Sequence, residues 1–314
     1  MLSNINIIIY NLTHNIMNWL ILLEKKLNKR VLPDKLYLSL LYKTKIGIKL
    51  DWVNPKTINE KLQWLKIYDR RPEYTIYVDK YKVRDYIAKT IGEEYLIPLL
   101  GVWNNPDEID FDKLPNQFVL KCNHDSGGLC ICKDKSTFDI INAKEKLRKS
   151  LKRDYYIEGR EWPYKNVPRK IIAEKKIANK DGSPLVDYKF YCYGGKPRYF
   201  MYSLGEAEHN VRNHKFDMNL NSIDHLFKNK PTINKESIVL PFNIKKMIEI
   251  VEKLCVGFPH IRIDLYNVDG QILFGEMTLY SGSGFINIES YEYSQKMADL
   301  IDISRIKNVQ TYNL

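Results

Sequence analysis

The most informative stretch of the sequence is residues 261–278, IRIDLYNVDGQILFGEMT. Two runs of alternating apolar residues flank an Asp-Gly turn, and this pattern predicts a β-hairpin. Because side chains alternate along a strand, Arg262 and Asp264 share one face of the first strand. Glu276 and Thr278 share one face of the returning strand for the same reason. The hairpin therefore presents polar side chains from both of its strands.

The two acids of this hairpin come together only if the strand pairing is irregular. A strict two-residue turn would place Asp264 opposite Gly275, so a longer loop or a β-bulge is needed to align Asp264 with Glu276. Once aligned, the two carboxylates could bind one hard cation, since Mg²⁺ is usually held by one or two carboxylates together with substrate phosphates. The alternative is a solvated strand face that carries ordinary surface charges.

The length and composition of the chain limit the classes of protein to which it can belong. At 314 residues the chain can bury a sizeable core and divide into two or three lobes. The net charge is +11, but the basic residues are scattered, which disfavours nucleic acid and fits an anionic nucleotide, sugar or membrane surface. The five cysteines are an odd number without a secretory signal, and this favours a reducing cytoplasm.

The first 30 residues have a mixed character. Polar side chains interrupt residues 5–23, so this segment predicts neither a membrane-spanning helix nor a signal peptide. An approximate helical stripe of apolar residues is nevertheless present, and four basic residues follow it. We expect either a helix docked on the core or on a second subunit, or an interfacial helix at a membrane surface. The stripe is Ile5, Ile8, Ile9, Leu12, Ile16, Leu20 and Leu23, and the basic residues are Lys25, Lys26, Lys29 and Arg30.

Two helices are expected between residues 57 and 92. Thr57 and Glu60 have the spacing of a capping box, which predicts that a helix begins there. A second helix is predicted to begin near Asp79 and to end at Gly92.

A second polar signal is the loop that follows the predicted strand 118–122. Ser126, Gly127 and Gly128 leave backbone N–H groups free to face an anion, and glycine permits close approach. Lys121 on the strand could place a positive charge against the same anion. The motif is not a P-loop, because no Gly-Lys-Ser/Thr opens a helix. A plain hairpin turn is the alternative.

The same segment contains Cys122, His124, Cys130 and Cys132, which are the residue types of a zinc site. Their spacings, Cys-x-His and Cys-x-Cys, are poor for a structural zinc site, whose paired ligands are usually two to four residues apart. Two cysteines on one strand face are also what any two core positions would show. Zinc binding is therefore kept only as an alternative.

A third signal is a predicted sheet with one charged face. Residues 170–177 form an apolar strand that abruptly becomes polar, and residues 185–193 alternate. Asp187, Lys189 and Tyr191 fall on one face of this second strand, and aromatic residues and a cysteine fall on the other. A nucleotide cleft needs such a charged face, whereas a packed core does not. A solvent-exposed sheet face is the alternative.

The order of these signals resembles the ATP-grasp superfamily, and the particular sequence resembles its teichuronopeptide-type, TupA-like branch. The resemblance covers roughly residues 50 to 300, and the first 50 residues lie outside it. Its motifs are specific in combination. They are NEKLQWLK at 59–66, DKYKVR at 79–84, FVLKCNHDSG at 118–127, DYKF at 187–190 and GEMTLY at 275–280.

The resemblance implies an α+β protein with the ATP-grasp fold, in which two α+β lobes close on ATP, and with a helical N-terminal region. The expected parts are a helical extension at 1–50, a pre-grasp region at 51–113, a glycine-loop lobe at 114–177 and a C-terminal metal-binding lobe at 178–314.

The resemblance also implies a role for each candidate residue. Lys121 would contact the α- and β-phosphates of ATP, and the Ser126–Gly128 loop would cover them. Asp187 and Lys189 would face ribose or phosphate, and Arg262 would face the γ-phosphate or an acyl-phosphate, so that Lys189 and Arg262 are the catalytic candidates. The hinge that reads adenine through its backbone would contain Glu174, Lys175 and Ile177.

The implied metal ligands are Asp264, Glu276 and Thr278, which would hold Mg²⁺. The superfamily commonly has Asn two residues after the second metal carboxylate, whereas this sequence has Thr278. A hydroxyl is a weaker ligand than an amide oxygen, so a second metal position is in doubt.

The implied activity is that of an ADP-forming carboxylate–amine ligase that uses ATP and Mg²⁺. Similar proteins are thought to attach an amino acid or amine to a uronic acid of a capsule, O-antigen or teichuronic-type polysaccharide, through an acyl-phosphate. The expected partners are therefore an anionic sugar or polysaccharide and an amino acid or amine, and not nucleic acid. We expect a cytoplasmic protein with peripheral contact to the inner membrane or to capsule assembly proteins.

Two other classes stay open from the sequence. A Mg²⁺-dependent glycosyltransferase of the same surface-polysaccharide pathway would also use acidic residues, although no compact Asp-x-Asp ends a strand and the Lys121 loop would go unexplained. A non-catalytic protein that only binds the polymer is the third option. ATP binding with Mg²⁺-dependent ADP release would separate the ligase from both.

Overall fold

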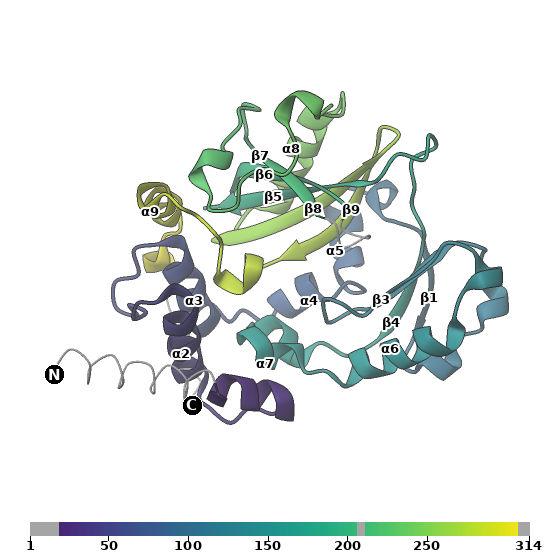
Figure 1. Ribbon diagram of the computed structural model, residues 1–314, viewed down its shortest axis with the longest axis horizontal. Helices are drawn as coiled ribbons and strands as arrows, with labels where there is room; N and C mark the ends of the chain where they lie inside the picture. Colours follow the sequence, from purple (N-terminus) through teal and green to yellow (C-terminus); the bar gives the residue numbers. More distant parts are fainter. Residues whose placement is uncertain (1–18, 206–210, 307–314) are drawn as a thin grey trace.

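The computed structural model describes residues 19–205 and 211–306 of the chain. Two antiparallel sheets dominate these ranges, and Figure 1 shows them as separate units. Helix α8 packs on strands β6 and β8 of the larger sheet, and helix α6 packs on strands β2 and β3 of the smaller one. Helices thus lie on the outer faces of both sheets. The mixed α+β class expected from the sequence is confirmed.

The larger sheet has five strands in the order β7-β6-β5-β8-β9. Its outer face is apolar because alternate residues of β5 and β8, such as Phe190 and Ile263, point toward α8 and are fully buried. The opposite face carries the charged residues of the same strands. The strands are β5 Val186–Tyr193, β6 Lys196–Leu204, β7 Arg212–Asp217, β8 His260–Val268 and β9 Gln271–Thr278.

The smaller sheet has four strands in the order β1-β4-β2-β3. Phe118, Leu120 and Cys122 point to one side of β2, where they form a core with α6. Strand β1 belongs to this sheet, so the lobe boundary expected at residue 114 falls within the sheet. The strands are β1 Leu99–Trp103, β2 Phe118–Cys122, β3 Leu129–Cys132 and β4 Ile171–Lys175.

The helices differ in part from the sequence prediction. The capping box at Thr57 and Glu60 is present and starts α3. The second helix was expected from Asp79, but it begins at Val83, because the Asp79 carboxylate accepts hydrogen bonds from two following backbone N–H groups and holds a turn. The helices are α2 Asp34–Ile46, α3 Ile58–Tyr68, α4 Tyr74–Val78, α5 Val83–Thr90, α6 Ile140–Lys152, α7 Tyr155–Gly159, α8 Ile244–Leu254 and α9 Tyr291–Asp299.

A further helix covers residues 19–27, the described part of the expected N-terminal helix. Ile21 is buried in a small core with α2, and Glu24 is 1% exposed and forms an ion pair with Arg160. These contacts support a docked helix, although Ile21 and Glu24 are not residues of the predicted stripe. The stripe residues Ile5 to Ile16 lie outside the described residues. Within the described ranges, no helix has both the length and the apolar character needed to cross a membrane.

Candidate active site

The β8–β9 hairpin aligns its two acids through the irregularity that the sequence requires. Asp264 pairs with Glu276, whereas the next residue, Leu265, pairs with Phe274, so Gly275 is an extra residue in β9. Glycine suits this position because a Cβ atom there would lie 3.0 Å from the Asp264 carbonyl oxygen. The bulge places both carboxylates on the charged face of the sheet.

Arg262 bridges the two acids. Its Nε and Nη2 atoms donate to the two oxygens of Asp264, both at 2.7 Å, and Nη2 also lies 2.5 Å from Glu276 Oε1. Such a bidentate pair fixes the guanidinium plane. The charges of Asp264 and Glu276 raise the pKa of Arg262 further above its usual range, although burial opposes them. Arg262 therefore remains a cation and offsets the negative charge of the two acids.

A third acid adjoins the pair from strand β5. The Lys189 Nζ atom lies 2.5 Å from Asp187 and 3.4 Å from Asp264, so it connects the two carboxylates. Burial and the nearby charge of Asp264 raise the pKa of Asp187 to about 7, in spite of Lys189. Asp187 therefore changes its charge near neutral pH.

Lys80 links this cluster to the glycine loop. Its Nζ atom donates to the Asp125 carbonyl oxygen at 2.8 Å and lies 3.9 Å from Glu276 Oε2. Burial acts to raise the pKa of Glu276, but the charges of Lys80, Arg262 and Lys189 outweigh it and lower the pKa to about 2. Glu276 is therefore ionised at every physiological pH.

Lys121 lies on the inner face of the smaller sheet, opposite to the core face of β2. Its Nζ atom is 2.6 Å from the Glu174 carboxylate, which also pairs with Arg84 at 3.3 Å. Glu174 thus holds the Lys121 side chain in position. The Lys121 side chain is 19% exposed, so part of it is accessible to solvent.

The glycine loop has a fixed base and an exposed tip. Asn123 is fully buried and bonds Asp79 and the backbone of residues 168 and 170. Gly128 packs against α6, where a Cβ atom would lie 2.3 Å from the Ser150 hydroxyl oxygen. Ser126 and Gly127 are exposed, and Gly127 has a positive φ of 116°. The tip can thus present backbone N–H groups to an anion.

The expected hinge residues lie where the chain leaves the smaller sheet for the larger one. Glu174 and Lys175 end strand β4, and Ile177 lies in the connection to β5. The Lys175 N–H already donates to the Pro98 carbonyl oxygen at 2.9 Å. Other backbone groups of this connection would therefore have to contact a base.

The cysteines of the alternative zinc site do not converge. The sulfur atoms of Cys122, Cys130 and Cys132 face three different carbonyl oxygens, those of Leu147, Ala143 and Asn116. His124 instead faces the Arg153 carbonyl oxygen. These side chains pack the core beneath α6, and the zinc interpretation is not supported.

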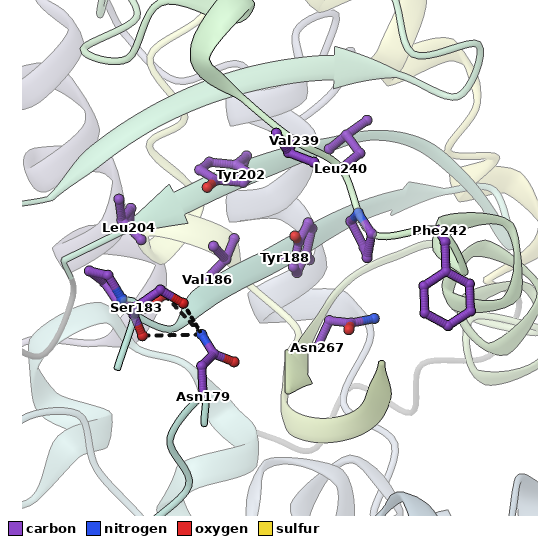
Figure 2. A pocket seen from close by; sticks show the side chains of 12 residues that line it. Asn179, Ser183, Val186, Tyr188, Tyr202, Leu204, Val239, Leu240, Phe242 and Asn267 are labelled. Carbon is purple, nitrogen blue, oxygen red and sulfur yellow. Dashed lines mark hydrogen bonds between the residues drawn. The ribbon is translucent and has the colours of Figure 1, made fainter. Parts of the chain in front are cut away.

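A separate pocket of about 550 Å³ lies on the opposite face of the larger sheet (Figure 2). Tyr188 and Tyr202 line it, and both alternate with residues of the charged face. The exposed Phe242 closes one end, and Asn179, bonded to Ser183, closes the other. This pocket contains none of the candidate site residues, so it is distinct from the site described above.

Sequence reasoning missed the roles of Lys80 and Arg84. Both belong to the DKYKVR motif, but they precede the sheets by many residues, and nothing local places them beside Glu276 or Glu174. The available signal was the motif itself, which contains three basic residues, Lys80, Lys82 and Arg84.

Comparison with known families gives a match with TupA-like ATPgrasp over residues 60–302. Comparison with curated proteins finds no match. Among solved structures, the chain is similar to D-alanine–D-alanine ligase from Bacillus anthracis complexed with ATP, at 18% identity and a TM-score of 0.38, over 74% of this chain and 65% of that one.

Two further solved structures show a similar level of likeness. D-alanine–D-alanine ligase from Helicobacter pylori has 14% identity and a TM-score of 0.42, over 78% of this chain and 68% of that chain. The ATP-grasp ligase PsnB complexed with minimal precursor, Mg and ADP has 10% identity and a TM-score of 0.39, over 80% of this chain and 67% of that chain. The chain thus spans about two thirds of the length of these structures.

Proposed function

The chain belongs to the TupA-like ATP-grasp family, and from this premise we propose that it is an ADP-forming ligase that joins a carboxylate to an amine. The ATP-grasp assignment made from the sequence is confirmed, and it supports an ATP-dependent ligase that works with Mg²⁺. The observation that carries the proposal is the pairing of Asp264 with Glu276 beside Arg262, on the sheet face that Lys80 connects to the glycine loop.

The donor set of the hairpin fits Mg²⁺. Asp264 and Glu276 supply hard carboxylate oxygens from paired positions, and the Thr278 hydroxyl bonds Glu276 at 3.0 Å. We propose that these three residues hold the metal. When bound, Mg²⁺ neutralises phosphate charge and polarises the transferred phosphoryl group. Arg262 would then leave Glu276 and face the γ-phosphate. We propose that a rotation of the Arg262 side chain is sufficient for this movement, because the guanidinium already contacts both acids.

The proposed roles of the remaining candidate residues are based on their contacts at the inner faces of the two sheets. Lys121 would leave Glu174 and bind the α- and β-phosphates, under the exposed tip of the Ser126–Gly128 loop. Lys189, held between Asp187 and Asp264, would stabilise charge that develops on the phosphoryl group, with Asp187 facing ribose. The connection that contains Ile177 would contact adenine.

The reaction needs activation of a poor electrophile. A carboxylate does not react with an amine directly, so its oxygen attacks the γ-phosphorus of ATP, the bond to ADP breaks, and an acyl-phosphate forms. The amine then attacks the carbonyl carbon and phosphate leaves. The residues of the site mainly position these groups and neutralise negative charge. Because water would hydrolyse the acyl-phosphate, we expect the glycine-loop lobe to close over the site.

For the substrates we propose a uronic acid of a capsule, O-antigen or teichuronic-type polysaccharide and an amino acid or amine. The net charge of +11 fits an anionic polymer. We further propose a cytoplasmic protein with peripheral contact to the inner membrane or to capsule assembly proteins. We also propose the four parts 1–50, 51–113, 114–177 and 178–314 as its functional divisions, with strand β1 of the second part joining the sheet of the third. Mass spectrometry of surface polysaccharide from a deletion strain would identify the sugar and the amine.

A thermal-shift experiment tests the nucleotide. Mg·ATP or Mg·ADP at about 100 times its Kd should stabilise the protein by about 2.7 kcal/mol, whereas UDP-sugars should not. Stabilisation by UDP-sugars and not by Mg·ATP would favour the glycosyltransferase and contradict the ligase.

A further inference from the structure

Glu161 is a buried acid that the proposed reaction does not yet use. Its side chain is 6% exposed and lies between α7 and the 3-10 helix η5, Trp162–Asn166. Burial raises the pKa of the Glu161 carboxyl, while the charges of Lys66 and Arg262 act in the other direction. Glu161 is thus within electrostatic reach of the residue that bridges Asp264 and Glu276.

The segment that carries Glu161 is anchored from outside the site. Its neighbour Arg160 is 0% exposed and has a positive φ of 52°. The Arg160 guanidinium forms ion pairs with Glu24 and Asp34 and lies 3.9 Å from the ring centre of Tyr37. These contacts of Arg160 fix the backbone next to Glu161, because the two residues are adjacent in the chain.

The polar neighbours of Glu161 leave its carboxylate able to accept further hydrogen bonds. Lys66 Nζ donates to the carbonyl oxygens of Gly159 and Ser283, at 2.7 and 2.8 Å, and to the Ser283 hydroxyl at 3.2 Å. An ammonium group has three protons, so these bonds use all of them. The Ser283 hydroxyl, which accepts from Lys66, can donate its own proton to Glu161. The carboxylate keeps lone pairs for a ligand that donates.

Two aromatic rings complete this cluster. Tyr155 and Tyr164 meet edge to face with ring centres 4.8 Å apart. The charges of Glu161 and Glu276 both act on these tyrosines, and with burial they raise the pKa of each hydroxyl. A carboxylate beside two aromatic rings is the surrounding that an organic ammonium ion prefers, through ionic and cation–π contacts. The cluster of Glu161, Tyr155, Tyr164 and Ser283 is named the α7–η5 cluster.

We propose that the α7–η5 cluster binds the ammonium group of the amine co-substrate and that Glu161 accepts a proton from it. This inference rests on the proposed ligase function and assigns the site of its second substrate. The position fits the role, because η5 packs on α4, which packs on strand β9 of the hairpin. The charges of Arg262 and Glu276, beside which the activated carboxylate would form, also act on the cluster.

The proton transfer accounts for a step that the ligase reaction requires. An ammonium nitrogen has no lone pair, so one proton must leave before the nitrogen attacks. Glu161 takes this proton. The lone pair then forms the C–N bond to the acyl carbon, and the C–O bond to phosphate breaks with its electrons on the phosphate oxygen. The second proton of the nitrogen leaves with the phosphate as HPO₄²⁻, and the amide keeps the third.

Hydroxylamine separates the two half-reactions, because it is uncharged at neutral pH and needs no proton acceptor before attack. Wild type and Glu161→Gln are given Mg·ATP, galacturonic acid and hydroxylamine, and hydroxamate is measured. The common amino acids, methylammonium and ethanolamine are then added singly, and both amide formation and competition with hydroxylamine are measured. Glu158→Gln is the matched control, because Glu158 lies on the neighbouring helix α7 and pairs with Arg153.

We expect E161Q to form hydroxamate at a rate within about threefold of wild type. With an ammonium probe that reacts, its rate of amide formation should fall at least about 100-fold, and with a probe that only competes with hydroxylamine, the inhibition should be lost. Equal amide formation or equal inhibition in both proteins would overturn this inference and leave the proposed ligase function standing. The same conclusion would follow if wild type formed hydroxamate but neither used any ammonium probe nor was inhibited by one. No hydroxamate and no ADP from wild type would instead contradict the proposed function, and the inference with it.

A second pair of variants decides the matter if E161Q does not fold. Tyr164→Phe keeps the ring, and Tyr164→Leu removes it. We expect the Leu variant to raise the KM or inhibition constant for the ammonium probe at least about fivefold, with the KM for Mg·ATP unchanged and the Phe variant like wild type. An unchanged constant for the probe in the Leu variant would contradict the aromatic part of the site.

Discussion

At the scale of single residues, the site is a balance of charge. The cations Lys80, Lys189 and Arg262 face three acids, and the pKa values of two of these acids shift in opposite directions. The pKa of Glu276 is lowered to about 2, whereas that of Asp187 is raised to about 7. Neighbouring carboxylates with opposite shifts are typical of functional sites, since burial of so many charges contributes little to stability.

The first prediction concerns the paired acids. Glu276→Gln and Asp264→Asn keep the shape of each side chain and remove its charge, so the proposed metal site is lost. We expect ADP release to fall at least about 100-fold while the protein stays folded. Steady-state kinetics with a melting curve of each variant checks this. The exposed Glu249→Gln on α8 is the control and should behave like wild type. Near-full turnover of either variant would show that the hairpin does not hold the metal.

The second prediction follows from Asp187. Its pKa is about 7 in the folded protein and lies near 3.8 when unperturbed, so folding favours the protonated form. This contribution to stability is complete below about pH 4 and is lost as the pH rises through 7. Asp187→Asn cannot titrate. The free energy of unfolding of wild type relative to D187N should therefore decrease between pH 4 and 7.

Urea denaturation of both proteins at several pH values checks this dependence. The sign is opposite for Glu276, whose lowered pKa contributes stability that is lost only in acid, below pH 4.5. A constant difference between wild type and D187N across this range would contradict the raised pKa.

The sequence predicted the residues of the hairpin well, because period-two alternation fixes which side chains share a face. It also required the irregularity that Gly275 provides. It did not find Lys80, Arg84 or Glu161, because each reaches the site through tertiary packing of a segment distant in sequence. The alternation of side chains along a strand gives no information about which cation from a distant segment joins a cluster of acids.

At the scale of elements, the glycine loop depends on close packing at its end. Gly128 faces Ser150 of α6, and the Ser150 hydroxyl bonds Asp125 of the same loop. The space between loop and helix is thus filled without a side chain at residue 128. This arrangement holds the base of the loop while Ser126 and Gly127 stay exposed.

The third prediction tests this packing. Gly128→Ala would place a Cβ atom 2.3 Å from the Ser150 oxygen and 2.9 Å from its Cβ atom, so the loop or the helix must shift. We expect a loss of about 1–3 kcal/mol in the free energy of unfolding and weaker binding of Mg·ATP. Urea denaturation and nucleotide titration measure both. Ser126→Ala, at the exposed tip, should change stability by less than about 0.5 kcal/mol. Unchanged stability of G128A would show that the contact is loose.

The strands were predicted more reliably than the helices. Strands such as Phe118–Cys122 matched the alternation of their residues. The helix expected from Asp79 begins later, at Val83, because Asp79 bonds the turn and also Asn123 of the glycine loop. Local capping signals cannot distinguish a residue that starts a helix from one that holds a turn for a distant partner.

At the scale of the whole molecule, the segment around α4 and α5 connects the two sheets. Lys80 contacts the glycine loop and Glu276, and Arg84 contacts Glu174 at the end of β4. The N-terminal helix contacts the segment that carries Glu161, since its Glu24 forms an ion pair with the adjacent residue Arg160. Its burial of Ile21 and Glu24 was not predicted, because the apolar stripe of the sequence indicated Leu20 and Leu23.

The fourth prediction separates the two parts of the N-terminus. Removal of residues 1–30 deletes Glu24 and leaves the buried Arg160 with Asp34 as the one carboxylate, of the two that pair with it in the described residues, that remains. We expect a loss of about 3–5 kcal/mol in the free energy of unfolding. Removal of residues 1–18 keeps Glu24 and should retain stability and Mg·ATP binding. Chemical denaturation of both truncations checks this, and equal stability of the 1–30 truncation would contradict the docked helix.

The membrane proposal is tested with the same truncations. If the apolar stripe and its basic residues bring the protein to an anionic membrane, loss of residues 1–18 should reduce sedimentation with vesicles that contain anionic lipid. Equal sedimentation of full-length and truncated protein would contradict a membrane role of these residues.

The central claim is that this site activates a carboxylate by phosphoryl transfer from ATP. The most direct measurement follows the oxygen of that carboxylate. The protein is incubated with Mg·ATP, hydroxylamine and galacturonic acid labelled with ¹⁸O in its carboxyl group, and the released phosphate is examined by mass spectrometry. The account predicts one ¹⁸O atom in the phosphate for each ADP formed, because the acyl-phosphate transfers a carboxylate oxygen to phosphorus. Release of ADP with unlabelled phosphate would contradict it.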